Sequence, residues 1–116
     1  MKIENIKFKA IRLDNCEWVE GDLMKESYGA RIIGHTGKAD NWIAVDPSTV
    51  CMFTGLKDKN GTPIYEGDIV MHKDNNAERR GDINWDSKAA AFCFGQDFLV
   101  HYHSEDMVVV GNKFDK

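Results

Sequence analysis

The sequence is poor in the features that mark several common classes of protein. It has two prolines, three cysteines without a CxxC pair, and no apolar run near the roughly 18 residues that span a bilayer. Cys16, Cys51 and Cys93 are odd in number and widely spaced, which argues against a disulfide framework and against a zinc site built on paired cysteines. We therefore expect a cytoplasmic protein with reduced thiols, neither secreted nor embedded in a membrane.

Basic residues are also in short supply. Fifteen Lys and Arg residues stand against 19 Asp and Glu residues, which gives a formal net charge of -4. Non-specific binding to nucleic acid depends mainly on neutralisation of phosphates by Lys and Arg. The composition therefore disfavours a general nucleic-acid binder, although a local basic patch is compatible with it.

The chain lacks a long segment with the 3.6-residue apolar period of a helix. It has instead short segments of high β-propensity, separated by turn residues about every ten positions. These segments are residues 6–12, 17–23, 30–34, 41–45, 50–55, 68–73, 82–86, 90–95, 98–103 and 107–112. The pattern predicts an all-β (mainly β) fold with little helix in one domain. We expect an N-terminal β-meander, residues 1–49, packed on an SH3-like barrel, residues 50–112.

The most distinctive text is FTGLKDKNGTPIYEGDIVMHK, residues 53–73. Asn60-Gly61 offers the two positive-φ positions of a type I′ hairpin turn. Pro63 has no N–H donor and should start a strand, and Gly67 permits a change of direction before the apolar Ile69. In this interpretation the stretch forms a hairpin and a strand start, and it indicates no chemistry.

The segment FTGLKDKNGTPIYEGDIV resembles the signature of the YopX family, small proteins found mostly in bacteriophages, prophages and related mobile elements. The text of residues 6–23, 41–50 and 108–112 also resembles that family, so the resemblance covers most of the chain. It implies a mostly β fold with an SH3-like part, a location in the bacterial host cytoplasm, and no catalytic residues that can be carried over.

On this basis we expect a phage- or prophage-type accessory protein that is not an enzyme and needs no cofactor. We expect it to act through contacts with a protein partner and to self-associate, because short edge strands can pair with another chain. The alternative is a nucleic-acid-binding module, in which cations and aromatic rings hold a strand. Its candidate surface consists of Lys57, Lys59, Lys73, Arg79 and Arg80.

Two histidines could bind a metal. His101 and His103 are two residues apart, and on a strand they would lie on one face, as zinc ligands could. The sequence indicates no third ligand, since His72 and Cys93 are distant candidates. We expect no metal site and an exposed strand face, with Tyr102 pointing into the core.

Other candidates for chemistry also have simpler structural interpretations. Cys51 or Cys93 could be a nucleophile, but a cysteine without a disulfide is more often a small buried hydrophobe. Asp58, Glu66 and Asp68 could bind Mg²⁺, but acids in turns usually serve local hydrogen bonds.

Two further features have simple interpretations as well. The segment GHTGK, residues 34–38, lacks the spacing of a phosphate loop. Trp18, Trp42 and Trp85 are expected to anchor the core.

Overall fold

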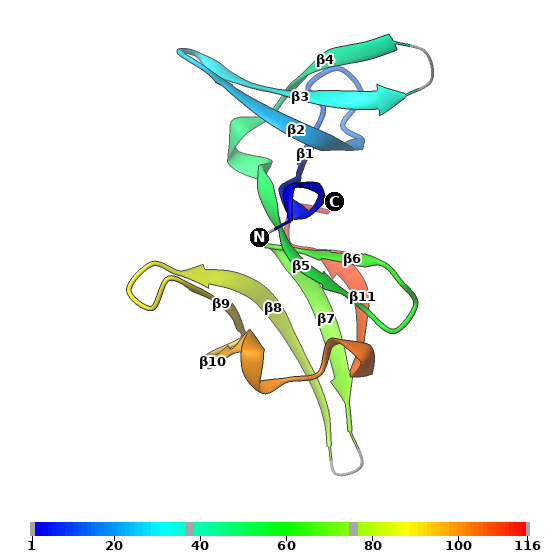
Figure 1. Cartoon of the computed structure of the whole chain (residues 1–116), viewed down its shortest axis with the longest axis vertical. Coiled ribbons are helices and arrows are strands. Elements are labelled where there is room, and N and C mark those ends of the chain that lie inside the picture. The colour runs from blue at the N-terminus through cyan, green and yellow to red at the C-terminus, as the bar shows by residue number, and fades with distance from the viewer. Residues whose placement is uncertain (1, 37–38, 75–76, 116) are drawn as a thin grey trace. The chain divides into compact units, whose positions relative to one another are not determined.

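The structure is a computed structural model that describes residues 2–36, 39–74 and 77–115 (Figure 1). The chain divides into two compact units, Met1–Phe53 (unit 1) and Thr54–Lys116 (unit 2). Most described residues lie in antiparallel strands, which confirms the predicted all-β class. The helical part of the described chain is a set of single 3-10 turns: η1 (Ile3–Asn5), η2 (Pro47–Thr49), η3 (Leu99–His101) and η4 (Ser104–Asp106). The SH3-like detail stays a prediction.

Unit 1 is built on antiparallel strands in the order β4-β3-β2-β1-β5. They are β1 (Phe8–Ile11), β2 (Trp18–Glu26), β3 (Gly29–Thr36), β4 (Ala39–Val45) and β5 (Cys51–Lys57), whose last residues belong to unit 2. Ala10, Ala30, Ile32 and Val45 form the buried cluster of this unit. Strand β1 pairs with β2, and β3 pairs with β4, each as an antiparallel pair of consecutive strands.

Strand β2 changes partner at Gly21. It pairs with β1 up to that residue and with β3 from Asp22 onward. The backbone of Gly21 comes so near to β3 that a Cβ atom there would lie 1.8 Å from the carbonyl oxygen of Ile33. Only glycine fits this close approach. The bend in the strand therefore depends on one residue without a side chain.

Unit 2 contains a five-stranded antiparallel sheet in the order β10-β9-β8-β7-β11. The strands of this unit are β6 (Pro63–Tyr65), β7 (Asp68–Lys73), β8 (Glu78–Asp86), β9 (Ala91–Phe94), β10 (Asp97–Phe98) and β11 (Met107–Asn112). Its core cluster consists of Ile64, Val70, Ile83, Phe94, Leu99 and Met107. Pro63 starts β6, as predicted.

The predicted strand over residues 98–103 is wrong. Strand β10 ends at Phe98, and the chain then forms the 3-10 turn η3, closed by a 3.0 Å hydrogen bond from the Tyr102 N–H to the Leu99 carbonyl. The turn buries Leu99 in the core and leaves Val100 exposed. Alternation of apolar residues cannot reveal this, because the burial of Leu99 is a tertiary effect.

The predicted type I′ turn at Asn60-Gly61 is also wrong. Gly61 has a φ of 81°, but Asn60 is not among the positive-φ residues that this turn type requires. The loop is organised by the buried carboxylate of Asp58 instead. Its Oδ1 accepts hydrogen bonds from the N–H groups of Asn60 and Thr62, and its Oδ2 accepts one from the N–H of Val109, each at 2.9 Å.

A second buried carboxyl group joins the start of β7 to the end of β11. Asp68 accepts hydrogen bonds from the Tyr65 N–H at 2.7 Å and from the side-chain amide of Asn112 at 2.9 Å. Next to it Gly67 has a φ of 86°, and its N–H donates to the Ile83 carbonyl at 2.6 Å. The predicted change of direction at Gly67 is thus confirmed.

Replacing Gly21 by Ala should destabilise unit 1 severely, by more than about 3 kcal/mol, because the backbone of β3 would have to move. The free energy of unfolding from urea titration measures this. Gly29→Ala is the matched control, since a Cβ atom at Gly29 meets no neighbour within 4 Å. Equal effects of the two changes would contradict the explanation.

Replacing Asp58 by Asn should destabilise unit 2 at pH 7 by about 1–3 kcal/mol, because the side-chain NH₂ group cannot accept the hydrogen bond from Val109. Desolvation raises the pKa of Asp58, but the hydrogen bonds from the N–H groups of Val109, Thr62 and Asn60 together lower it by more. The net shift of the pKa is therefore downward. A lowered folded-state pKa means that the stabilisation is present above the unfolded value of about 3.9 and is lost as pH falls through the folded value.

Urea unfolding at a series of pH values should therefore show the difference between wild type and Asp58→Asn shrinking below about pH 4. Hydrogen exchange of the Thr62 and Val109 amides supplies the local measurement. Asp106→Asn, which changes an exposed carboxylate of the same unit, should leave stability and exchange unchanged. A difference that did not depend on pH would contradict the role of the charged carboxylate.

Candidate functional site

The candidate basic surface contains two adjacent arginines that point to opposite faces of β8. Arg79 pairs with the buried His72 of β7, and Arg80 pairs with Met71. Neighbouring residues of a strand alternate between the faces of the sheet. Lys73 belongs to the same face as Arg80 and lies opposite Glu78. Arg79 and Arg80 therefore cannot contribute to one flat basic surface.

Arg79 takes part in a hydrogen-bonded network in unit 2. Its Nη1 lies 3.0 Å from Asp97 Oδ2 and donates to the Tyr102 hydroxyl at 2.6 Å, and that hydroxyl donates to Asp97 Oδ2 at 2.8 Å. The guanidinium carbon lies 5.7 Å from the ring centre of Phe94. The donors Tyr102 and Arg79 lower the pKa of Asp97, and the bond to Asp97 raises the pKa of Tyr102. These contacts give Arg79 a structural role.

The remaining residues of the candidate surface are exposed. Lys57 ends β5, Lys59 follows Asp58 in the loop, and the Lys59 N–H donates to the carbonyl of Met107 at 3.0 Å. Lys73 and Arg80 lie on neighbouring strands. Binding of nucleic acid by these side chains stays a prediction.

The two candidate metal ligands are not on a strand face. His101 closes η3, and His103 precedes η4 with its Nδ1 3.9 Å from Glu105 Oε1. Tyr102, between them, is half-buried against the core, as predicted. Among the described side chains, no three His, Cys, Asp or Glu residues gather closely enough to hold a metal ion.

The two candidate nucleophilic cysteines are both buried in the fold. Cys93 is buried, and burial raises the pKa of its thiol, with a further contribution from Asp86 and Asp97. Cys51 is buried and donates from its Sγ to the carbonyl of Thr49 at 3.2 Å. In the segment GHTGK, which lacks the spacing of a phosphate loop, Gly34 belongs to β3, whereas residues 37–38 lie outside the described residues.

The prediction that all three tryptophans anchor the core is wrong for two of them. Trp42 is 49% exposed and Trp85 is 46% exposed, whereas Trp18 is half-buried. Single apolar residues scattered over a surface are normal, whereas aromatic side chains are enriched at protein interfaces. A large exposed ring is therefore a better indication of a binding surface. Trp42 belongs to the edge strand β4 and is a candidate for contact with a partner, whereas the ring of Trp85 packs against Phe92 with the ring centres 5.0 Å apart.

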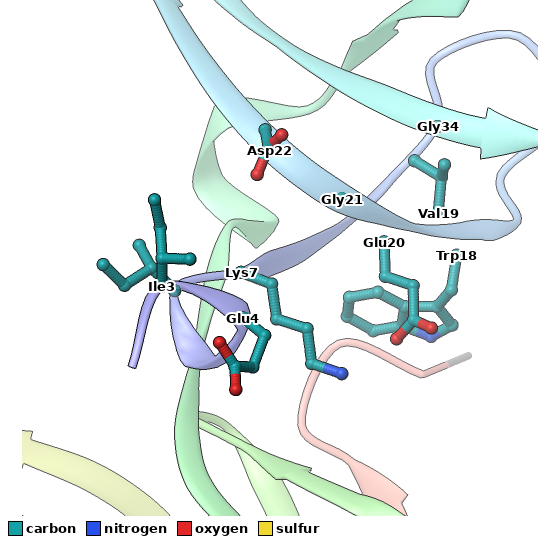
Figure 2. Close-up of a pocket in the computed structure, with 10 residues that line it drawn as sticks. Ile3, Glu4, Lys7, Trp18, Val19, Glu20, Gly21, Asp22 and Gly34 are labelled. Atoms are coloured by element: carbon teal, nitrogen blue, oxygen red, sulfur yellow. The ribbon is translucent and has the colours of Figure 1, made fainter. Parts of the chain in front are cut away.

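Unit 1 contains a groove of about 540 Å³ between η1 and the first half of β2 (Figure 2). Its apolar lining comes from Ile3, Ile6, Trp18 and Val19. Ile3 is 82% exposed and Ile6 is 41% exposed. The backbones of Gly21 and Gly34 complete the lining, and a Cβ atom at Gly34 would lie 3.5 Å from Val19. A Cβ atom at Gly21 would instead meet the backbone of β3.

The charged groups that line this groove are mainly acidic. Glu4, Glu20 and Asp22 contribute carboxylates, and Lys7 contributes an ammonium group. In the view of Figure 2 the end of the Lys7 side chain lies between the Glu4 and Glu20 carboxylates. The Lys7 Nζ lies 4.5 Å from the ring centre of Phe53, within unit 1. The groove therefore combines carboxylates, one ammonium group and apolar side chains.

A protein-family model described as YopX protein matches residues 4–116. The chain belongs to the YopX family. No curated protein and no solved structure matches it. In this YopX family member the text that resembles the family signature forms β5, β6 and the start of β7, where Asp58 and Asp68 hold the backbone. That text therefore supports the fold.

Sequence reasoning missed the groove of this YopX family member. Ile6 belonged to an alternating segment, and the N-terminal residues before it carried no recognised pattern. The signal that was available is an isoleucine, Ile3, that lies outside any predicted strand.

Among the residues that the structure describes, no helix has the length and apolar character that crossing a bilayer requires.

Replacing Arg79 by Ala should lower the free energy of unfolding by about 1 kcal/mol, because a half-exposed ion pair and a cation–ring contact are lost. Arg80→Ala is the matched control on the opposite face and should change stability by less than about 0.5 kcal/mol. Thermal and urea unfolding of both variants measure the difference. A larger effect at Arg80 would contradict the structural role of Arg79.

Proposed function

We propose that this YopX family member is a non-enzymatic protein-interaction module that self-associates through the outer edge of β4. The observation that carries the proposal is the open backbone at Trp42, next to an edge that is closed from Ala44 onward. It supports association because unpaired N–H and C=O groups on an edge strand are a template for another strand.

Part of the β4 edge is covered by the chain itself. The Leu13 N–H donates to the Ala44 carbonyl at 3.2 Å, and the Asp46 N–H donates to the Ile11 carbonyl at 2.8 Å. Arg12 and Val45 form the bridge between these two bonds. This segment, residues 11–13, covers the edge at Ala44 and ends there.

The neighbouring edge position is Trp42. The backbone groups of a strand residue point to the same side as those of the residue two positions away. Those of Trp42 therefore point outward with those of Ala44, and no partner is present for them among the described residues. The backbone of Asp40 has the same direction.

Apolar side chains surround this open edge. Leu13 is 63% exposed beside Trp42. A second groove, of about 350 Å³, lies here and is lined by Arg12, Leu13, Asp14, Trp42, Ile43 and Ala44. The Arg12 guanidinium and the Asp14 carboxylate pair with each other at 2.6 Å, so the groove carries little net charge.

A second copy of the chain fits this edge in an antiparallel register about a two-fold axis at Asn41. Trp42 of one copy then faces residue 40 of the other, and both residues point outward to form a hydrogen-bonded pair. The register repeats itself by symmetry, as an isologous interface requires. It also leaves Ala44 with its own partner, Leu13.

The non-enzymatic part of the proposal is supported by how the buried polar side chains are used. Asp58 and Asp68 accept hydrogen bonds from backbone and amide donors of the fold, and Asp97 is held by Arg79 and Tyr102. A catalytic site needs polar groups that converge on a substrate. The phage or prophage setting and the bacterial cytoplasm remain expectations drawn from the family.

Sedimentation equilibrium over about 1 µM to 1 mM should show a dimer in reversible equilibrium with the monomer. Pairing along one strand edge buries a small interface, and small interfaces give weak association. Trp42→Lys should weaken the dimer by about tenfold or more, since a lysine on the edge opposes strand pairing and the apolar ring is lost. Circular dichroism should show that the variant keeps its fold.

Trp85→Lys is the matched control, because that tryptophan is similarly exposed but belongs to unit 2. It should leave the dissociation constant unchanged. A strictly monomeric protein at the highest concentration would overturn the proposal, as would a dimer that Trp85→Lys weakens and Trp42→Lys does not.

A further inference from the structure

We propose that Asn60-Gly61 is a site of spontaneous deamidation, and that Asp58 keeps this site unreactive while its loop is closed. Asparagine is among the chemically labile residues of proteins. A following glycine has no side chain that could block access to the asparagine side chain. The sequence contains a single Asn-Gly pair. This inference does not depend on self-association, since the loop belongs to unit 2.

The reaction joins atoms of two neighbouring residues. The backbone nitrogen of Gly61 attacks the Cγ atom of Asn60, the Cγ–Nδ2 bond breaks, and the proton of the attacking nitrogen leaves with the NH₂ group as ammonia. The product is a succinimide ring, which water then opens at either of its two carbonyl groups. One opening gives aspartate. The other gives isoaspartate, in which the backbone continues through the side-chain carbon atoms.

In the folded loop the attacking nitrogen is already engaged. The Gly61 N–H donates to the Asp58 carbonyl at 3.0 Å, and the Asp58 N–H donates to the Thr62 carbonyl at 2.9 Å. With the φ of 81° at Gly61, these two bonds define a three-residue hairpin loop, in which a tight turn is followed by a glycine bulge. To reach the Asn60 side chain, the nitrogen has to give up its hydrogen bond. The attack therefore requires the turn to open.

The carboxylate of Asp58 restrains the same residues from a buried position. Its Oδ1 accepts hydrogen bonds from the N–H groups of Asn60 and Thr62, and its Oδ2 accepts one from the N–H of Val109, each at 2.9 Å. Asp58 is 6% exposed, whereas Asn60 and Gly61 are exposed. Beyond its two neighbours in the chain, a Cβ atom at Gly61 would meet no described atom within 4 Å. Hydrogen bonds rather than side-chain packing therefore hold the pair in place.

Deamidation would change this loop irreversibly. Either product places a carboxylate at position 60, next to the buried carboxylate of Asp58, and like charges in one site disfavour each other. Isoaspartate also lengthens the backbone before Gly61 by one carbon atom, which displaces the N–H groups of Gly61 and Thr62 from Asp58. Modified chains should therefore have a less stable unit 2, and refolding does not restore the amide.

The test measures the rate of deamidation at Asn60 in the whole chain, in a mildly alkaline buffer. Chromatography and mass spectrometry of proteolytic peptides distinguish the asparagine, aspartate and isoaspartate forms over time. The folded wild type should react at least about tenfold more slowly than the same chain unfolded in guanidinium chloride, because only open molecules react. In hydrogen exchange, the Gly61 amide of the folded wild type should be protected.

Two variants separate opening of the loop from unfolding of the whole unit. Asp58→Ala removes all three hydrogen bonds to the carboxylate and should raise the rate in native buffer by about fivefold or more. The matched control is Ile83→Ala, which destabilises unit 2 from its core. It should raise the rate by less than about twofold. Circular dichroism shows whether each variant is folded, and where one is not, Asp58→Asn and Ile83→Val are compared instead.

Four results would overturn the inference. They are equal rates in the folded and the unfolded wild type, no deamidation at Asn60 in the unfolded chain, free exchange of the Gly61 amide in the folded protein, and equal acceleration by the folded Asp58 and Ile83 variants. The last result would mean that Asp58 protects the site only through the stability of the whole unit.

Discussion

A carboxyl group in a protein interior needs hydrogen-bond donors, because its burial without them is costly. Unit 2 depends on this constraint at Asp68, which is fully buried and accepts hydrogen bonds from the Tyr65 N–H and the Asn112 side chain. Asp58 meets the same need with three backbone donors, one of them from Val109. The two acids thereby join residues 58 and 68 to β11, which is 51 and 44 positions later in the chain, respectively.

This arrangement explains how the family signature relates to function. Asp58, Gly67 and Asp68 of the signature hold one loop and one strand start of unit 2. The open strand edge and the groove lie elsewhere, in unit 1. One is the β4 edge beside Trp42, and the other is the acidic, apolar groove with Ile3.

Much of the strand pattern could be predicted from local chemistry. Residues 68–73 and 107–112 were predicted as strands and form β7 and β11 with the same bounds. The segment after Phe98 could not be predicted, because Leu99 is drawn into the core by contacts with residues far along the chain. The type I′ turn predicted at Asn60-Gly61 is wrong for a similar reason. Asp58 offers the loop stronger hydrogen bonds than an isolated turn would have.

The amino-acid sequence by itself determined the β class, the family and the absence of a cysteine or histidine motif. These properties depend on residue types and on the spacing of residues that are close together in the sequence. Only the tertiary structure decided which apolar residues stay exposed. Trp42 and Ile3 resemble core residues in the text, but their burial depends on whether another strand covers them. The approach of Gly21 to β3 is likewise a contact between residues on different strands.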